Sequence, residues 1–322
     1  MKKSTKIWLI TAVLLILVGA LILCCVDAET KGDLGVLSNK KYETNRHAIE
    51  EEFKDIVVKT NTADVEILPS EGGAVEVVCV EESKEKHAVS VKDGALTVEV
   101  VDTRKWYDYI GIFGMKAPKI TVCIPAGEYG NLTVKASTGD VRTGESLRFE
   151  SVDIKISTGN IESLASCKGT MKLGTNTGDV KVKNASAAML DILGGTCKIS
   201  VENVTCEGEL SASATTGATK ITDTTCARFV SSANTSDLTM KNVVAAGEFL
   251  IRRTTGDVRF EKCDAAEIAV TTGTGDVKGS LLSEKIFVTK SGTGKIKVPE
   301  TTSGGKCKVT TTTGNIILTI EH

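Results

Sequence analysis

The five residues STGDV at positions 137–141 decide the fold, because related words occur ten times in the chain. The words are STGDV, STGNI, NTGDV, GTCKI, TTGAT, NTSDL, TTGDV, GTGDV, GTGKI and TTGNI, centred on positions 139, 159, 178, 197, 217, 236, 256, 275, 294 and 314. Their spacing is always 19 or 20 residues. A fixed period of this length without a helical pattern predicts stacked units that are stable only against their neighbours.

Apolar residues alternate within each repeat, as they do along one face of a β-strand. Valine, isoleucine or leucine usually stands two residues after the central position, and a second alternating pair follows later, for example Met171 with Leu173. Each rung should therefore contain two short strands and two bends, with equivalent strands pairing in parallel. Because crossovers between parallel strands are almost always right-handed, the sequence predicts an all-β right-handed parallel β-helix, a solenoid with about 19.5 residues per rung.

Threonine precedes the central position in all ten words, and glycine holds the central position in eight of them. Glycine permits a turn with positive φ, and the Asp or Asn that often follows is a local turn residue. We interpret the threonine hydroxyls as a ladder that satisfies backbone groups of the turns; an ice-binding array would need a flatter face. The predicted ladder includes Thr138, Gly139, Thr158, Gly159, Thr177, Gly178, Thr255, Gly256, Thr274, Gly275, Thr293, Gly294, Thr313 and Gly314.

Two words depart from glycine, at Cys197 and Ser236, and we expect these positions to cost local strain. The Asp and Asn residues after the glycine resemble those of calcium-binding repeats, which need carboxylates from turns on both sides. Here the period is twice as long, and Lys198, Ala218 and Lys295 interrupt the column. The sequence therefore predicts no calcium site.

The chain begins with a basic segment, residues 1–6, followed by Ile7 to Val26 without a charged side chain. Twenty such residues are enough to cross a bilayer as a helix, and the lysines before them place the amino terminus in the cytoplasm. We therefore predict a single-pass transmembrane anchor over 7–26 in the cell membrane, with the lipid bilayer as its partner and the solenoid extracellular. A cleaved signal peptide, processed near Ala28, is the alternative.

Residues 27–50 are polar and without period, which is typical of a linker. Residues 51–130 alternate irregularly and predict an N-terminal cap, with a hairpin turn at Lys92–Gly94. The word NTADV at 61–65 precedes the first full copy by 76 residues, or four periods, and is interpreted as part of irregular early rungs. Residues 131–322 form the regular solenoid.

One stretch, residues 102–115, does not follow the sequence pattern of the solenoid rungs. It holds Trp106, Tyr107, Tyr109 and Phe113 close together, beside charged residues. These rings either pack as the lid of the cap or face a ligand, because aromatic residues are preferred in recognition surfaces. They are the candidate partner-binding residues of the sequence.

No reactive constellation is found among the remaining residues. There is no CxxC pair, no Cys/His spacing for a metal and no nucleophile near the three histidines, so we predict no catalytic, cofactor or metal site. Cys206 and Cys226 are 20 residues apart and are either a disulfide between adjacent rungs or buried apolar thiols. With a net charge of −2 and mixed signs, nucleic acid is not expected as a partner, nor is a small-molecule substrate.

The sequence also resembles a known family, the DUF4097 family of proposed adhesins. The resemblance rests on DTRKWYDYIGI at 102–112, ITVCIP at 120–125, EYGNLTVKASTGDV at 128–141 and the serial TGDV or TGNI words, and covers roughly residues 53–320. It implies a bacterial envelope protein with an amino-terminal membrane segment, an extracellular parallel β-helix and, by family name, adhesion or an envelope-stress function. No family catalytic residues exist to carry over.

The leading hypothesis is a non-enzymatic, membrane-anchored scaffold that binds an envelope polymer or a surface protein. The alternative is an accessory or sensor-like protein of an envelope-stress regulatory system. A polysaccharide-active β-helix enzyme is a remote third, because such enzymes gather charged residues at one place, whereas here similar residues are spread one per rung. Fold alone never implies activity.

Overall fold

The computed structural model describes residues 3–30, 42–103 and 117–321. These described residues form one helix, α1 (Lys3–Thr30), and 26 strands that belong to a single sheet. The strands of the N-terminal part are β1 Tyr42–Ile49, β2 Asp55–Thr60, β3 Asp64–Pro69, β4 Val75–Glu82, β5 Glu85–Lys92, β6 Ala95–Asp102 and β7 Lys119–Ile124.

The regular part follows with β8 Gly127–Thr138, β9 Val141–Thr143, β10 Leu147–Thr158, β11 Ile161–Ser163, β12 Ser166–Cys167, β13 Thr170–Thr177, β14 Val180–Ala187, β15 Met189–Thr196, β16 Ile199–Cys206, β17 Glu209–Thr216, β18 Thr219–Cys226, β19 Arg228–Thr235 and β20 Leu238–Thr255. The last strands are β21 Val258–Thr274, β22 Val277–Leu281, β23 Lys285–Thr293, β24 Ile296–Lys297, β25 Gly305–Thr313 and β26 Ile316–Ile320.

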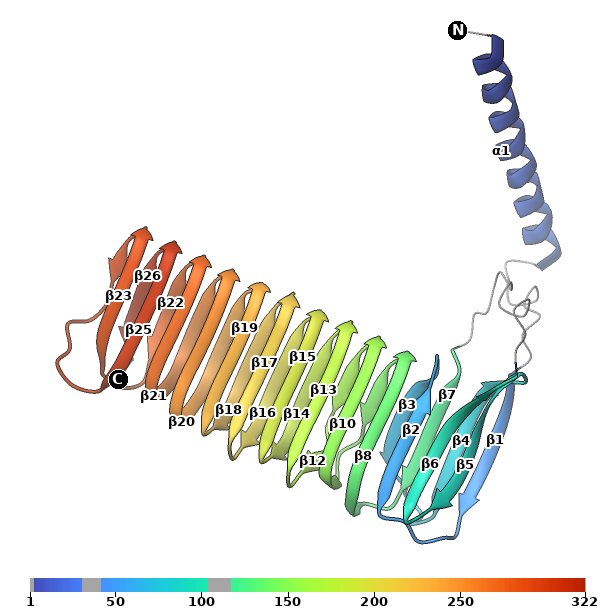
Figure 1. The fold of residues 1–322 in the computed structure, drawn as a ribbon, viewed down its shortest axis with the longest axis horizontal. Helices are drawn as coiled ribbons and strands as arrows, with labels where there is room; N and C mark the ends of the chain where they lie inside the picture. The colour runs from blue at the N-terminus through green and yellow to red at the C-terminus, as the bar shows by residue number, and fades with distance from the viewer. Residues whose placement is uncertain (1–2, 31–41, 104–116, 322) are drawn as a thin grey trace.

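The repeats stack as a parallel β-solenoid, so that successive rungs lie side by side along a rod (Figure 1). Val141 pairs with Ile161, Ile161 with Val180, and Val180 with Ile199, so each word lies over the next. The glycines form one file: a methyl group at Gly178 would collide with the carbonyl oxygen of Gly159. The predicted all-β solenoid is therefore present, with its apolar residues facing inward.

The corner amides are held by the Asp and Asn column and not by the threonine hydroxyls. The Oδ1 atom of Asp140 accepts a hydrogen bond from the backbone amide of Asn160, 2.8 Å away in the next rung. Equivalent contacts of 2.6–3.0 Å follow the stack, from Asp64 to Asp140, Asn160 to Asp179, Asp179 to Lys198, Asp237 to Asp257, Asp257 to Asp276, Asp276 to Asn315 and Asn315 to Lys295. Within the described part of the chain, the ten threonine side chains are exposed and donate no hydrogen bond.

Each central rung also bends at a position that the sequence reading did not predict. Asn184, Asn203, Asp223 and Asn242 are non-glycine residues with φ of 49–54° inside strands β14, β16, β18 and β20. Asparagine and aspartate tolerate this left-handed conformation better than other side chains. Their side chains also pair between rungs, with Asn203 Nδ2 donating to Asn184 Oδ1 at 2.9 Å.

The expected strain at Cys197 and Ser236 is absent, because neither residue has a positive φ. Both side chains are buried, at 4% and 3% exposure, and therefore point into the corner. Cys197 has room because the residue three positions earlier is Gly194, where any side chain would collide with the Cys197 sulfur. The backbone at these two corners thus adopts an ordinary conformation.

The two ends of the rod depart from simple chain order. The last repeat in the sequence lies inside the stack: Ile316 pairs with Val277 on one side and with Ile296 on the other. The rung formed by β23 and β24 is consequently the outer one. At the other end, the word NTADV lies in an early rung, and its Val65 pairs directly with Val141, so the 76 residues between the two words do not add four stacked rungs.

The residues between these two words form the cap. β6 and β7 make the next layer, pairing in parallel with β2 and β3. β5 returns antiparallel to β6 through the predicted turn, where Asp93 and Gly94 have positive φ. β4 lies antiparallel to β7, and β1 lies antiparallel to β4. The antiparallel layers thereby close the parallel stack, as a solenoid end requires.

The predicted N-terminal helix is present as α1, which includes all of residues 7–26. In the residues that the structure describes, no helix is both long enough and apolar enough to cross a membrane. The eight cysteines from Cys79 to Cys307 are free thiols and seven of them are buried. Cys206 and Cys226 therefore form no disulfide in the structure, which agrees with the reading of buried apolar thiols.

Arg253 is an unusual residue of the core, because it occupies an inward position that Ala233 and Thr272 hold in the neighbouring rungs. Its side chain donates to Ser231 Oγ and to the Arg252 carbonyl, both at 2.9 Å, while Nε has no hydrogen-bond partner among the described residues. Burial lowers the pKa of Arg253 to about 10, against an opposing effect of Asp237. At every pH below about 10 the Arg253 guanidinium is therefore charged, and its burial lowers the stability of the folded protein.

We expect Arg253→Met to raise the free energy of unfolding by about 1–3 kcal/mol, because methionine keeps the volume and removes a poorly compensated buried charge. Urea denaturation at neutral pH measures the change. Arg252→Met, at the exposed neighbouring position, is the matched control and should change stability by less than about 0.5 kcal/mol. A loss of stability in Arg253→Met alone would show that the hydrogen bonds of the guanidinium outweigh its desolvation.

Candidate functional site in the N-terminal cap

The candidate site lies where β4 and β5 close the end of the solenoid. Cys79 and Glu81 are two residues apart on β4, so both side chains point to the same face. That face points to the interior, because Val77, Cys79 and Glu81 are each at most 1% exposed. His87, on β5, is buried as well at 6% exposure. A chain reversal between Glu82 and Glu85, which pair with each other, brings the three together.

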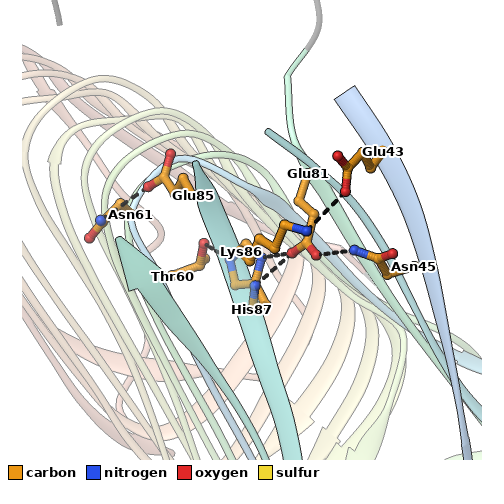
Figure 2. Close-up of polar contacts among 8 residues, drawn as sticks. All are labelled: Glu43, Asn45, Thr60, Asn61, Glu81, Glu85, Lys86 and His87. Carbon is orange, nitrogen blue, oxygen red and sulfur yellow. Dashed lines mark hydrogen bonds and ion pairs between the residues drawn. The ribbon is translucent and has the colours of Figure 1, made fainter. Parts of the chain in front are cut away.

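The centre of the cluster is a contact between His87 and Glu81 (Figure 2). Glu81 Oε2 lies 2.8 Å from His87 Nδ1 and also accepts the backbone amide of His87 at 2.6 Å. Asn45 Nδ2 donates to the other carboxylate oxygen, Oε1, at 2.6 Å. His87 Nε2 lies 3.0 Å from Thr60 Oγ1. The ring and the carboxylate are thus each fixed from two sides.

Further acidic residues surround this pair. Glu82 and Glu85 are 6% and 3% exposed, and Asn61 Nδ2 donates to Glu85 Oε1 at 3.1 Å. Burial of carboxylates without compensation is costly, so such a cluster is stable only if each group has partners. Burial raises the pKa of the Cys79 thiol to about 12, and the neighbouring Glu81 carboxylate adds to the shift. The thiol is therefore protonated at neutral pH when no cation lies beside it.

Two kinds of chemistry can be considered for this arrangement. Thr60, His87 and Glu81 follow the order hydroxyl, imidazole, carboxylate that is used in nucleophilic catalysis. However, Thr60 is only 7% exposed and both ring nitrogens of His87 are engaged inside the core, which does not favour attack on a substrate. The second possibility is metal ligation, because one ligand atom each of Cys79, Glu81 and His87 lies within 4.8 Å of the others.

The candidate partner-binding residues of the sequence, Trp106, Tyr107, Tyr109 and Phe113, lie outside the described residues. The structure does place the ends of their segment. β6, which precedes the segment, pairs with β2, where Glu99 lies opposite Lys59. β7, which follows the segment, pairs with β3, where Lys119 lies opposite Asp64.

Sequence reasoning missed the cap cluster because it searched for CxxC pairs and Cys/His spacings. The three side chains come from two strands, and one of them is a glutamate. A signal was present: in VVCVEESKEKHAV at 77–89, the alternation that places Val77 inward also places Cys79 and Glu81 inward. A glutamate at an inward strand position requires a buried partner.

Comparison with solved structures supports the fold. A proposed lipid-binding protein from Parabacteroides distasonis ATCC 8503 matches with a TM-score of 0.55 and 16% identity, over 75% of this chain and 98% of that chain. A proposed adhesin from Bacteroides fragilis NCTC 9343 matches with a TM-score of 0.41 and 14% identity, over 88% of this chain and 99% of that chain. Of these two likenesses the first supports the fold, and at 16% identity it concerns the fold alone. No curated protein matches this chain.

Comparison with family models agrees with the resemblance seen in the repeated words. The model of Toastrack DUF4097 matches residues 53–228 and 207–322, which together include every described strand from β2 to β26. The described architecture, in which a repeated Thr-Gly corner stacks into a parallel β-solenoid, lies within those limits. The chain therefore belongs to the Toastrack DUF4097 family.

Proposed function

We propose that this protein is a non-catalytic scaffold of the bacterial cell envelope, whose solenoid binds a repetitive envelope polymer or a surface protein. The helix α1 would tether it to the membrane, since residues 7–26 contain no charged side chain. The solved structure from Parabacteroides distasonis, which is described as a proposed lipid-binding protein, agrees with a binding role. The cluster in the cap is buried and would stabilise the end of the rod.

The exposed threonine column carries this proposal. Thr158 pairs with Thr177, Thr177 with Thr196 and Thr196 with Thr216, so their backbones follow one another at the spacing of paired strands, about 4.8 Å. Their hydroxyls are exposed and, in the described part of the chain, have no protein partner. A linear array of free hydroxyl groups can hydrogen-bond to successive units of a linear polymer. Each contact would be weak, and their number would give the affinity.

The test is cosedimentation of the full-length protein, in mild detergent, with purified cell-wall sacculi. The wild type should pellet with the sacculi, and the triple variant Thr158→Val, Thr177→Val, Thr196→Val should lose at least about 10-fold in apparent affinity. The matched control replaces Thr205 and Thr225 by valine, which are exposed on another side of the rung. Equal pelleting of both variants, or no pelleting of the wild type, would refute binding through this column.

A further inference from the structure

We propose that the N-terminal cap contains a binding site for one divalent transition-metal ion, of which Zn²⁺ is the best match, with Cys79, Glu81 and His87 as ligands. The three ligand atoms lie within 4.8 Å of one another before any ion is present. Ligands of one tetrahedral zinc ion are about 3.3–3.8 Å apart, as follows from zinc–ligand distances of about 2.0–2.3 Å. Small side-chain rotations would therefore suffice. This site is independent of the proposed polymer binding.

The donor set selects the metal. A thiolate, an imidazole nitrogen and a carboxylate oxygen are the ligands that zinc uses in proteins, whereas Ca²⁺ and Mg²⁺ require oxygen ligands only. Three protein ligands leave a fourth position for water. The soft sulfur donor also favours zinc, cobalt or iron over the alkaline-earth ions.

The charges of the cluster also favour a dication. Glu81 is 1% exposed, and its carboxylate accepts hydrogen bonds only from Asn45 and His87 among the described contacts. A deprotonated Cys79 would add a second negative charge, and the two charges of Zn²⁺ would balance those of Cys79 and Glu81. Metal binding to a cysteine displaces the thiol proton, so Cys79 would bind the ion as a thiolate.

The surrounding contacts already orient the ligands. In zinc sites, the histidine nitrogen that does not bind the metal usually donates to an oxygen, which fixes the ring. Here Thr60 Oγ1 lies 3.0 Å from His87 Nε2 and can accept its proton (Figure 2). An ion bound between His87 Nδ1 and Glu81 Oε2 would then replace the present contact of these two atoms, which are 2.8 Å apart. Asn45 holds the second oxygen of Glu81 at 2.6 Å. Both ligands thus have the supporting contact that a metal site needs.

The first experiment uses the full-length, reduced chain in mild detergent, with Cys24 and Cys25 replaced by serine so that only the cap and solenoid thiols remain. After chelator treatment, Co²⁺ is added as a spectroscopic substitute for Zn²⁺. We expect binding of one equivalent, with a near-ultraviolet thiolate-to-cobalt band and the visible bands of tetrahedral coordination. Cobalt bound without a thiolate band, or no stoichiometric binding, would overturn the proposal, and this result requires no variant of the cluster.

The second experiment measures Zn²⁺ affinity by competition with a chromophoric chelator. Cys79→Ser and His87→Gln should each weaken binding by about 100-fold or more, and Thr60→Val by about 10–100-fold through loss of the supporting contact. Cys123→Ser is the matched control, because Cys123 lies on the adjacent strand β7, outside the cluster, and should bind as the parent does. Equal affinities in all variants would assign the ion to another place and refute the site.

Discussion

Gly178→Ala is expected to lower the free energy of unfolding by about 3 kcal/mol or more, and the melting temperature by roughly 6–12 °C. Two costs add. Gly178 has φ of 129°, a conformation that residues with a side chain rarely adopt, and its added methyl group would collide with the carbonyl oxygen of Gly159. The obstacle is backbone of the next rung, so it can move only if the parallel pairing opens. Thermal and urea unfolding measure the loss.

Gly127→Ala is the matched control. Gly127 is the first residue of β8, has no positive φ, and a methyl group there would contact nothing within 4 Å. Its replacement should leave stability unchanged or raise it by up to about 1 kcal/mol, because alanine reduces the freedom of the unfolded chain. If both variants lost stability equally, any replacement of glycine by alanine in a rung would destabilise the protein, and the loss could not be assigned to the geometry of the corner.

The repeated corner could be predicted because it imposes one residue type at one interval. At eight of the ten corners the glycine has a positive φ and a side chain would collide with the backbone of the neighbouring rung, so glycine recurs at intervals of about 19 or 20 residues and reveals the stack. The role of the following Asp or Asn could have been inferred from the same column. Its Oδ1 accepts the next rung's amide, a contact that the threonine two positions earlier does not make.

The order of the last rungs could not be predicted from the period, because all rungs resemble one another. The structure gives a physical reason why the rung of β23 and β24 lies outside the rung of β25 and β26. Lys295 donates its amide to Asn315 but has no side-chain oxygen with which to hold a further rung. Its rung is outermost, where no further amide has to be held. A residue without a side-chain oxygen at this position does not by itself place a rung at the end, because Lys198 and Ala218 stand inside the stack.

The cap was predicted as a region and not as a site. Alternation in residues 51–130 indicates strands, and the turn at Asp93–Gly94 indicates a hairpin. Which strand lies over which depends on long-range pairing, such as Val65 with Val141, that no local pattern contains. The contact between Glu81 and His87 depends on the chain reversal between β4 and β5, where Glu82 pairs with Glu85. Buried polar clusters of this kind are visible in a sequence only as polar residues at inward positions.

Glu81→Ala is the second variant with a large expected effect, a loss of about 3–5 kcal/mol in the stability of the cap, measured in the presence of a chelator. The carboxylate accepts from Asn45 Nδ2 and from the backbone amide of His87, and it contacts His87 Nδ1. Alanine leaves these groups buried without an acceptor and also leaves a cavity, and each uncompensated donor costs about 1–3 kcal/mol. Amide hydrogen exchange in β4 and β5 should rise while exchange in β13–β19 stays slow, since rungs depend mainly on their neighbours.

Glu76→Ala provides the control on the same strand. Glu76 pairs with Arg46 at 3.0 Å, but both side chains are partly exposed, at 36% and 64%. An ion pair in contact with water contributes at most about 1 kcal/mol, so this variant should leave cap exchange nearly unchanged. Glu81→Gln should fall between the two, because its single carbonyl oxygen can still accept from one side. If Glu81→Ala behaved like Glu76→Ala, water would have to enter the cap and replace the carboxylate, and the cluster could not close the end of the rod.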